Sequence, residues 1–253
     1  MNSATRFISF CLALLTLPAC AAQAGLERAK LDFDGRERTY YVSAPDAGSG
    51  PFPLVVLLHG SGGDGAQMID RWKAIAAQES IALAAPNSLH SAEGWTLRDD
   101  GPDFIHAVIL AALANHPVDP RRLYLFGQSG GAVYALNLGL LESEYFAAVA
   151  FHAGGWRNPA EYKFADYARR KIPIAMYVGD EDEYFSVGSV QATERALAQR
   201  GLPVELHLLA GRRHAYTDVP DDFNGTVWKF LKANSLADAP KFTPYRLGGA
   251  PLR

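Results

Sequence analysis

The chain has 253 residues, with 24 basic and 27 acidic side chains, and its formal net charge is −3. This mild acidity, without a cluster of Lys and Arg, disfavours nucleic acid or an anionic membrane surface as a partner. The length is sufficient for one large α/β domain with a sizeable core.

The first 24 residues are typical of an export signal. Arg6 supplies a basic start, residues 7–17 are almost wholly apolar, and residues 22–24 form a small-x-small cleavage site. Removal of this segment takes away one positive charge, so the mature net charge becomes −3 − 1 = −4. We therefore expect an exported bacterial protein, periplasmic or extracellular, whose mature chain starts at Gly25.

Both cysteines, Cys11 and Cys20, lie inside the expected signal, so the mature chain would contain no disulfide. A second reading of the same segment remains open. Residues 17–20, Leu-Pro-Ala-Cys, resemble a bacterial lipoprotein cleavage box, in which Cys20 would become the lipidated first residue. Pro18 fits that box poorly, so cleavage after Ala24 is the favoured prediction.

The remaining pattern predicts one α/β domain over residues 25–234, followed by a tail over 235–253. Residues 29–44 alternate in polarity around Asp34-Gly35, which predicts an antiparallel hairpin. Short apolar runs and helical segments then alternate, as in a mostly parallel, doubly wound sheet. The predicted strands are 54–58, 81–85, 123–126, 147–151, 172–178 and 204–209. The predicted helices are 67–78, 105–113, 130–141, 190–199 and 222–233, and Asp103 is expected to help cap the second of them.

A serine flanked by glycines lies at an expected turn from a strand into a helix. Residues 127–131 read Gly-Gln-Ser-Gly-Gly, a G-x-S-x-G motif between an apolar run and a helical segment. So abrupt a turn strains the serine backbone and crowds residues two before and two after it, and glycine relieves that crowding. We expect Ser129 to be an exposed nucleophile at the carboxyl end of its strand.

A second glycine-rich loop, His-Gly-Ser-Gly-Gly at residues 59–63, follows an earlier strand. Loops at this place supply backbone N–H groups to a developing oxyanion. We predict that the amides of Ser61 and Gly130 are these donors, with Gly62 as a substitute for Ser61. His59 precedes the serine in the chain and is interpreted as structural.

A serine nucleophile needs an imidazole base and a carboxylate behind it, in the chain order serine, acid, histidine. Of the later histidines, His207 lies within an apolar strand and is expected to be buried, and His152 precedes every plausible acid. His214, in a loop after the last strand, is the predicted base. Residues 180–183 offer four carboxylates after the penultimate strand; Asp182 is favoured, Asp180 is the alternative, and the acidic run could instead bind calcium or be solvated.

These motifs together resemble secreted bacterial α/β-hydrolase esterases of the polyhydroxybutyrate depolymerase, feruloyl and acetylxylan esterase group. The resemblance extends from about residue 38 to 231, and its most specific part is residues 119–131, Asp-Pro-Arg-Arg-Leu-Tyr-Leu-Phe-Gly-Gln-Ser-Gly-Gly. It implies the α/β-hydrolase fold and a triad of Ser129, Asp182 and His214. It also implies ester hydrolysis through an acyl-enzyme, without a cofactor or metal.

Small soluble or oligomeric esters, hydroxyalkanoate and aryl or acetyl sugar esters among them, are the expected substrates. Trp95 and Trp156 are predicted to wall an acyl or aryl pocket. Asp99 and Asp100 are interpreted as charges at a helix start. The same triad would also serve a peptidase or a thioesterase, whereas a non-catalytic binding protein would normally lack one of the three residues.

Overall fold

The computed structural model describes residues 25–46, 50–243, 246–247 and 250–251, so the expected signal and Cys20 lie outside the described residues. The strands are β1 (Glu27–Phe33), β2 (Arg36–Ser43), β3 (Phe52–Leu58), β4 (Ala82–Pro86), β5 (Val118–Gln128), β6 (Ala148–His152), β7 (Ile174–Gly179), β8 (Val204–Leu209), β9 (Arg246–Leu247) and β10 (Ala250–Pro251). The helices are α1 (Gly65–Glu79), α2 (Pro102–Asn115), α3 (Gly130–Leu141), the 3-10 helix η2 (Pro159–Tyr167), α4 (Val187–Ala198) and α5 (Phe223–Lys232).

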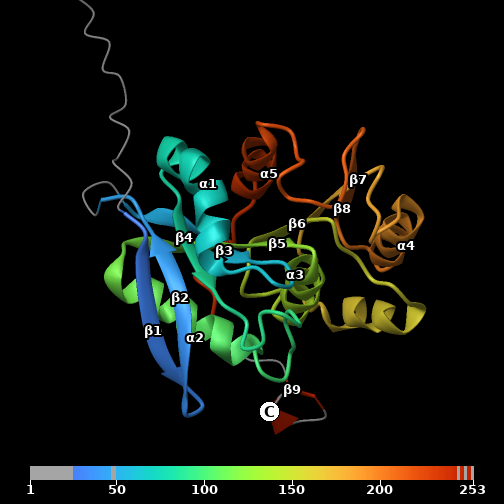
Figure 1. Cartoon of the computed structure of the whole chain (residues 1–253). Helices are drawn as coiled ribbons and strands as arrows, with labels where there is room; N and C mark the ends of the chain where they lie inside the picture. Colours follow the sequence, from blue (N-terminus) through green and yellow to red (C-terminus); the bar gives the residue numbers. More distant parts are fainter. Residues whose placement is uncertain (1–24, 47–49, 244–245, 248–249, 252–253) are drawn as a thin grey trace, which may run out of the picture.

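The main sheet has eight strands in the order β1-β2-β4-β3-β5-β6-β7-β8 (Figure 1). β1 and β2 form the predicted antiparallel hairpin, and Asp34 and Gly35 both take the positive φ that its tight turn requires. β2 pairs antiparallel with β4, and the pairs from β4 to β8 are all parallel. The predicted α/β-hydrolase architecture with an N-terminal hairpin is confirmed.

Helices cover both faces of this sheet. Along the fully buried β3, Leu54, Val56 and Leu58 belong to one apolar cluster, while Val55 and Leu57 belong to the other. Side chains of α2, α3 and α4 pack into the first cluster, and side chains of α1 and α5 pack into the second. Helices α1 and α5 lie side by side in Figure 1. Such a two-sided core explains why the strand sequences are continuously apolar rather than alternating.

Several local predictions need correction. β8 is an edge strand, so His207 is half-exposed instead of buried, with its ring on Tyr177 and its Nε2 2.9 Å from Glu205. α2 starts after Gly101 without a side-chain cap, and Asp103 lies in its first turn. Helix η2 was missed, although Asn158 and Glu161 form the capping box that marks such a start.

The start of the tail, up to Phe242, lies against the domain. The Leu236 amide donates to the Arg121 carbonyl oxygen, and the Phe242 ring stacks on His106 with centroids 3.8 Å apart. Among the described residues, no helix is long and apolar enough to cross a membrane.

Candidate active site

Ser129 lies at the turn between β5 and α3, where the prediction placed it. Its backbone has φ 53° and ψ −118°, a region that L-residues seldom occupy, and its amide donates to the His152 carbonyl oxygen at 3.0 Å. This hydrogen bond fixes the strained turn to β6, the neighbouring strand.

The two glycines around this serine are required by close backbone packing. A Cβ built on Gly127 would overlap the Gly131 carbonyl oxygen, and one on Gly131 would overlap the carbonyl oxygens of Leu58 and His59. The predicted crowding two residues before and after Ser129 is confirmed. The contact at Gly131 shows that the end of β3 also packs closely against the start of α3.

His214, in the loop after β8, lies beside Ser129. Its Nε2 lies 2.8 Å from Ser129 Oγ, and its Nδ1 lies 3.0 Å from Asp182 Oδ2 and 3.1 Å from Oδ1. The Asp182 side chain is fully buried, and that of His214 is 15% exposed. Three residues from three separate loops thus form one continuous hydrogen-bonded chain.

The structure distinguishes the two candidate aspartates. Asp182 Oδ1 accepts from the amides of Tyr184 and Phe185, each at 2.8 Å, and faces His214. Asp180 is exposed, and its Oδ1 accepts from the Gly211 amide at 2.7 Å instead. No group of three or more metal-binding side chains was found among the described residues, and the acidic run forms no such cluster.

Ser61 and Gly130 lie together with Ser129 around a cavity of about 250 Å³. The Ser61 amide nitrogen and Oγ are the atoms that a Cβ on Gly130 would meet first, so the two residues face each other closely. The amide of Gly62, the substitute donor, is already bonded to the Ser91 carbonyl oxygen at 2.7 Å. This arrangement favours Ser61 over Gly62.

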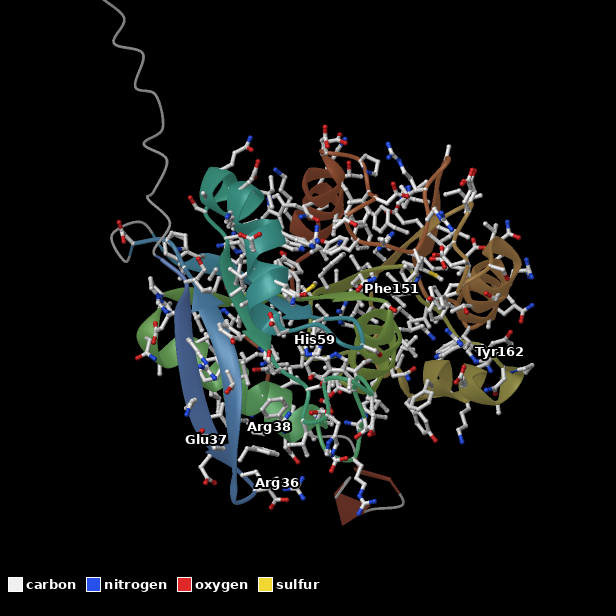
Figure 2. The ribbon with its side chains drawn as sticks, viewed as in Figure 1. Arg36, Glu37, Arg38, His59, Phe151 and Tyr162 are labelled. Carbon is white, nitrogen blue, oxygen red and sulfur yellow. The ribbon has the colours of Figure 1, made fainter. Side chains whose placement is uncertain are left out.

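The histidines set aside in the sequence do not approach Ser129 Oγ as His214 does. His59, labelled near the middle of Figure 2, is 1% exposed. Its Nδ1 lies 2.8 Å from the Gly60 carbonyl oxygen, and its Nε2 accepts from the Ser88 amide. Burial lowers the pKa of His59, which favours its neutral form. His152 is buried beneath Tyr216, and burial together with the nearby His214 lowers the pKa of His152 to about 4.

The two tryptophans have different roles in the structure. Trp95 lines a second cavity of about 370 Å³, with its Nε1 bonded to the His59 carbonyl oxygen and its ring stacked on Tyr134. Trp156 does not line either cavity; it is 1% exposed and packs in the core. The prediction of Trp156 as a pocket wall is therefore wrong, because its ring packs against Asn137 of α3 and Tyr162 of η2.

Asp100 is not a charge at a helix start either. It is buried, forms an ion pair with Arg38 of β2 at 2.5 Å, and accepts from the amides of Leu89 and Thr96. This pair ties the hairpin to the loop that carries Trp95. Asp99 is partly exposed and accepts from the Thr96 hydroxyl.

Five residues of the Ser129 cavity were not anticipated: Val133, Gly155, Arg157, Glu161 and Phe185. The Arg157 guanidinium lies 4.5 Å from the Phe185 ring centroid, while Glu161 accepts from the Arg157 amide. The capping box was the available sequence signal for Glu161. No local pattern indicated that Phe185 would turn toward the serine.

Comparison with known proteins assigns the family. Residues 73–237, more than half of the chain, match the dienelactone hydrolase family. The chain belongs to the dienelactone hydrolase family. The matched region contains Ser129, Asp182 and His214 and begins after the glycine loop that carries Ser61.

This member of the dienelactone hydrolase family also resembles individual proteins. It is 33% identical over 162 residues to NocK of Nocardia uniformis subsp. tsuyamanensis, a protein named as an esterase. That match covers 58% of this chain and 46% of NocK, so the chain spans less than half the length of this relative.

Two solved structures illustrate the fold. Esterase PE8 has a TM-score of 0.62 at 23% identity, over 76% of this chain and 96% of PE8. The S-formylglutathione hydrolase FrmB from Staphylococcus aureus has a TM-score of 0.67 at 15% identity, over 86% of this chain and 98% of FrmB. At these identities the likeness shows the fold alone. The polyhydroxybutyrate depolymerase and feruloyl esterase group named from the sequence remains a prediction.

Proposed function

We propose that this chain is a serine hydrolase of carboxylic esters that acts through an acyl-enzyme. One observation carries the proposal: Ser129 Oγ, His214 and Asp182 form a single hydrogen-bonded chain on a strained strand-to-helix turn. Family membership and the esterase name of NocK support hydrolysis. Small soluble esters are the proposed substrates.

The geometry supports a specific sequence of bond changes. Ser129 Oγ attacks the acyl carbon while His214 Nε2 takes the hydroxyl proton, and Asp182 holds the Nδ1–H and stabilises the imidazolium. The amides of Ser61 and Gly130 receive the oxyanion. His214 then returns the proton to the leaving alcohol oxygen. Water, activated in the same way, releases the carboxylic acid and restores Ser129.

Hydrolysis of p-nitrophenyl esters, from acetate to dodecanoate, by residues 25–253 tests this proposal. The Ser129→Ala variant should retain its melting temperature and lose at least about a thousandfold in kcat/KM, because the triad nucleophile is absent. A wild-type protein inert on every ester, or a variant as active as wild type, would contradict the assignment.

We further propose that the protein is exported, as the sequence of residues 1–24 indicates. Mass spectrometry of the mature N-terminus tests this separately from catalysis. A chain that starts at Gly25 supports signal cleavage. A diacylated Cys20 would overturn it in favour of a lipid anchor, and an intact Met1 would overturn both forms of export processing.

A further inference from the structure

The cavity beside Trp95 adjoins the serine and has a mainly apolar wall. It shares Gly130 and Val133 with the cavity of Ser129, so the two form one continuous lined surface along α3. Its volume of about 370 Å³ is in the range of small-molecule pockets. The remaining lining residues are Glu93, Trp95, Leu97, Tyr134 and Asn137. An acyl group bound to Ser129 would therefore extend along α3 into this cavity.

One face of α3 lines the route from Ser129 to the cavity beside Trp95. Gly130, Val133, Tyr134 and Asn137 are spaced i, i+3, i+4 and i+7, which places them on the same side of a helix. At 1.5 Å per residue, Asn137 lies about 12 Å along the axis from Ser129, and helical side chains lean back toward the N-terminus. The Asn137 amide thus lies roughly 10 Å from the acyl carbon.

The buried Trp156 fixes which way this amide points. Its indole Nε1, which can only donate, lies 2.8 Å from Asn137 Oδ1. Trp156 is itself held because it is 1% exposed and its amide donates to Thr193 Oγ1 at 2.9 Å. The Asn137 oxygen must therefore face the core. Within the described part of the chain, Asn137 Nδ2 has no hydrogen-bond acceptor, and it remains the donor available to the cavity.

We propose that Asn137 determines acyl specificity by donating from Nδ2 to a neutral acceptor oxygen far along the acyl chain. The inference rests on the proposed esterase function. With a hydrogen bond of about 2.9 Å, that oxygen belongs roughly 7–8 Å from the ester carbon. Glu93, the charged residue of this cavity, disfavours an acyl group that ends in a carboxylate. The favoured class is a medium-length acyl group with a distal ketone, ether or hydroxyl oxygen.

The test compares p-nitrophenyl 7-oxooctanoate with p-nitrophenyl octanoate, because the ketone only accepts hydrogen bonds. Wild type should prefer the keto ester by about tenfold in kcat/KM. Asn137→Leu removes the donor, and Asn137→Asp keeps an oxygen for Trp156 but replaces the donor with a carboxylate. Both variants should lose the preference, and Asn137→Asp should reverse it.

Two controls locate the effect. The exposed Asn115 at the end of α2 is the matched amide, and Asn115→Leu should retain the wild-type ratio. The short pair p-nitrophenyl 3-oxobutyrate and butyrate places its ketone out of reach, so its ratio should be insensitive to residue 137. Trp156→Phe removes the indole donor that orients Asn137 and should weaken the long-chain preference while leaving the short-pair ratio unchanged.

The outcomes separate this inference from the function on which it rests. Folded Asn137 variants, with wild-type melting temperatures, that keep the wild-type keto preference would overturn the role of Asn137 while leaving ester hydrolysis intact. A wild-type protein that hydrolyses neither ester, or activity that survives Ser129→Ala, would overturn the proposed function and this inference together.

Discussion

At the scale of single residues, environment decides which carboxylate can serve His214. Asp182 is buried, accepts two backbone N–H bonds and faces the imidazole, so its oxygens are held in one place. Asp180 has the same chemistry two residues earlier, but it is exposed and bonded to the Gly211 amide. A pair of identical side chains therefore provides an internal comparison.

Asp182→Asn should reduce kcat by about 10⁴-fold, because an amide facing Nδ1 favours the wrong imidazole tautomer. Asp180→Asn, the matched substitution, should remain within a few-fold of wild type. Steady-state hydrolysis of one p-nitrophenyl ester by both variants is the measurement. Equal losses, or a larger loss at Asp180, would show that the orienting acid has been misassigned.

At the scale of elements, the turn that carries Ser129 depends on the close approach of β5, β3 and α3. Gly127 borders the backbone of Gly131, and Gly131 borders the end of β3, with no room for a side chain at either place. A glycine with open surroundings is available elsewhere for comparison. Among the described residues, apart from its chain neighbours and the backbone of its own helix, nothing lies within 4 Å of a Cβ built on Gly188, in the first turn of α4.

Gly127→Ala should lower the free energy of unfolding by about 3 kcal/mol, because backbone atoms must move to admit the methyl group. Activity should fall as well, since Ser129 sits on the displaced turn. Gly188→Ala should be neutral or stabilising by up to about 1 kcal/mol. Urea unfolding of both variants checks this, and a Gly127→Ala protein as stable as wild type would refute the packing argument.

At the scale of the whole molecule, the core that faces α1 and α5 contains an imidazole. His152 is fully buried against Tyr216 and Phe223, and neither ring nitrogen has a hydrogen-bond partner among the described residues. Burial, and next the proximity of His214, lower the pKa of His152 to about 4. The folded protein therefore resists protonation at a position where the unfolded chain accepts a proton readily.

The sign of the resulting pH dependence is fixed. An unfolded histidine has a pKa near 6.5, so between pH 6.5 and 4 the unfolded state binds more protons and stability falls as the pH falls. The full shift corresponds to roughly 3 kcal/mol. His152→Phe should flatten the curve of unfolding free energy against pH in this window, measured by urea unfolding. The exposed His90→Gln control should follow wild type, and a His152→Phe curve that also follows it would disprove the account.

The sheet and the serine turn could be predicted because their signals are local. Continuous apolar runs indicate strands buried on both faces, and glycines two before and after Ser129 report backbone crowding within five consecutive residues. Chain order added the approximate positions of the candidate acid and base. The exposure of His207 was mispredicted because an apolar strand sequence does not reveal whether that strand lies at the edge.

What the amino-acid sequence determined by itself was the fold class, the Asp34-Gly35 hairpin and the place of Ser129, since each depends on backbone preferences over a few residues. Only the tertiary structure decided that Asp182, not Asp180, faces His214, that Trp156 lies in the core, and that the Trp156 indole donates to the Asn137 amide oxygen. Those outcomes depend on side chains from loops and helices far apart in the chain, whose meeting is set by the packing of the whole sheet.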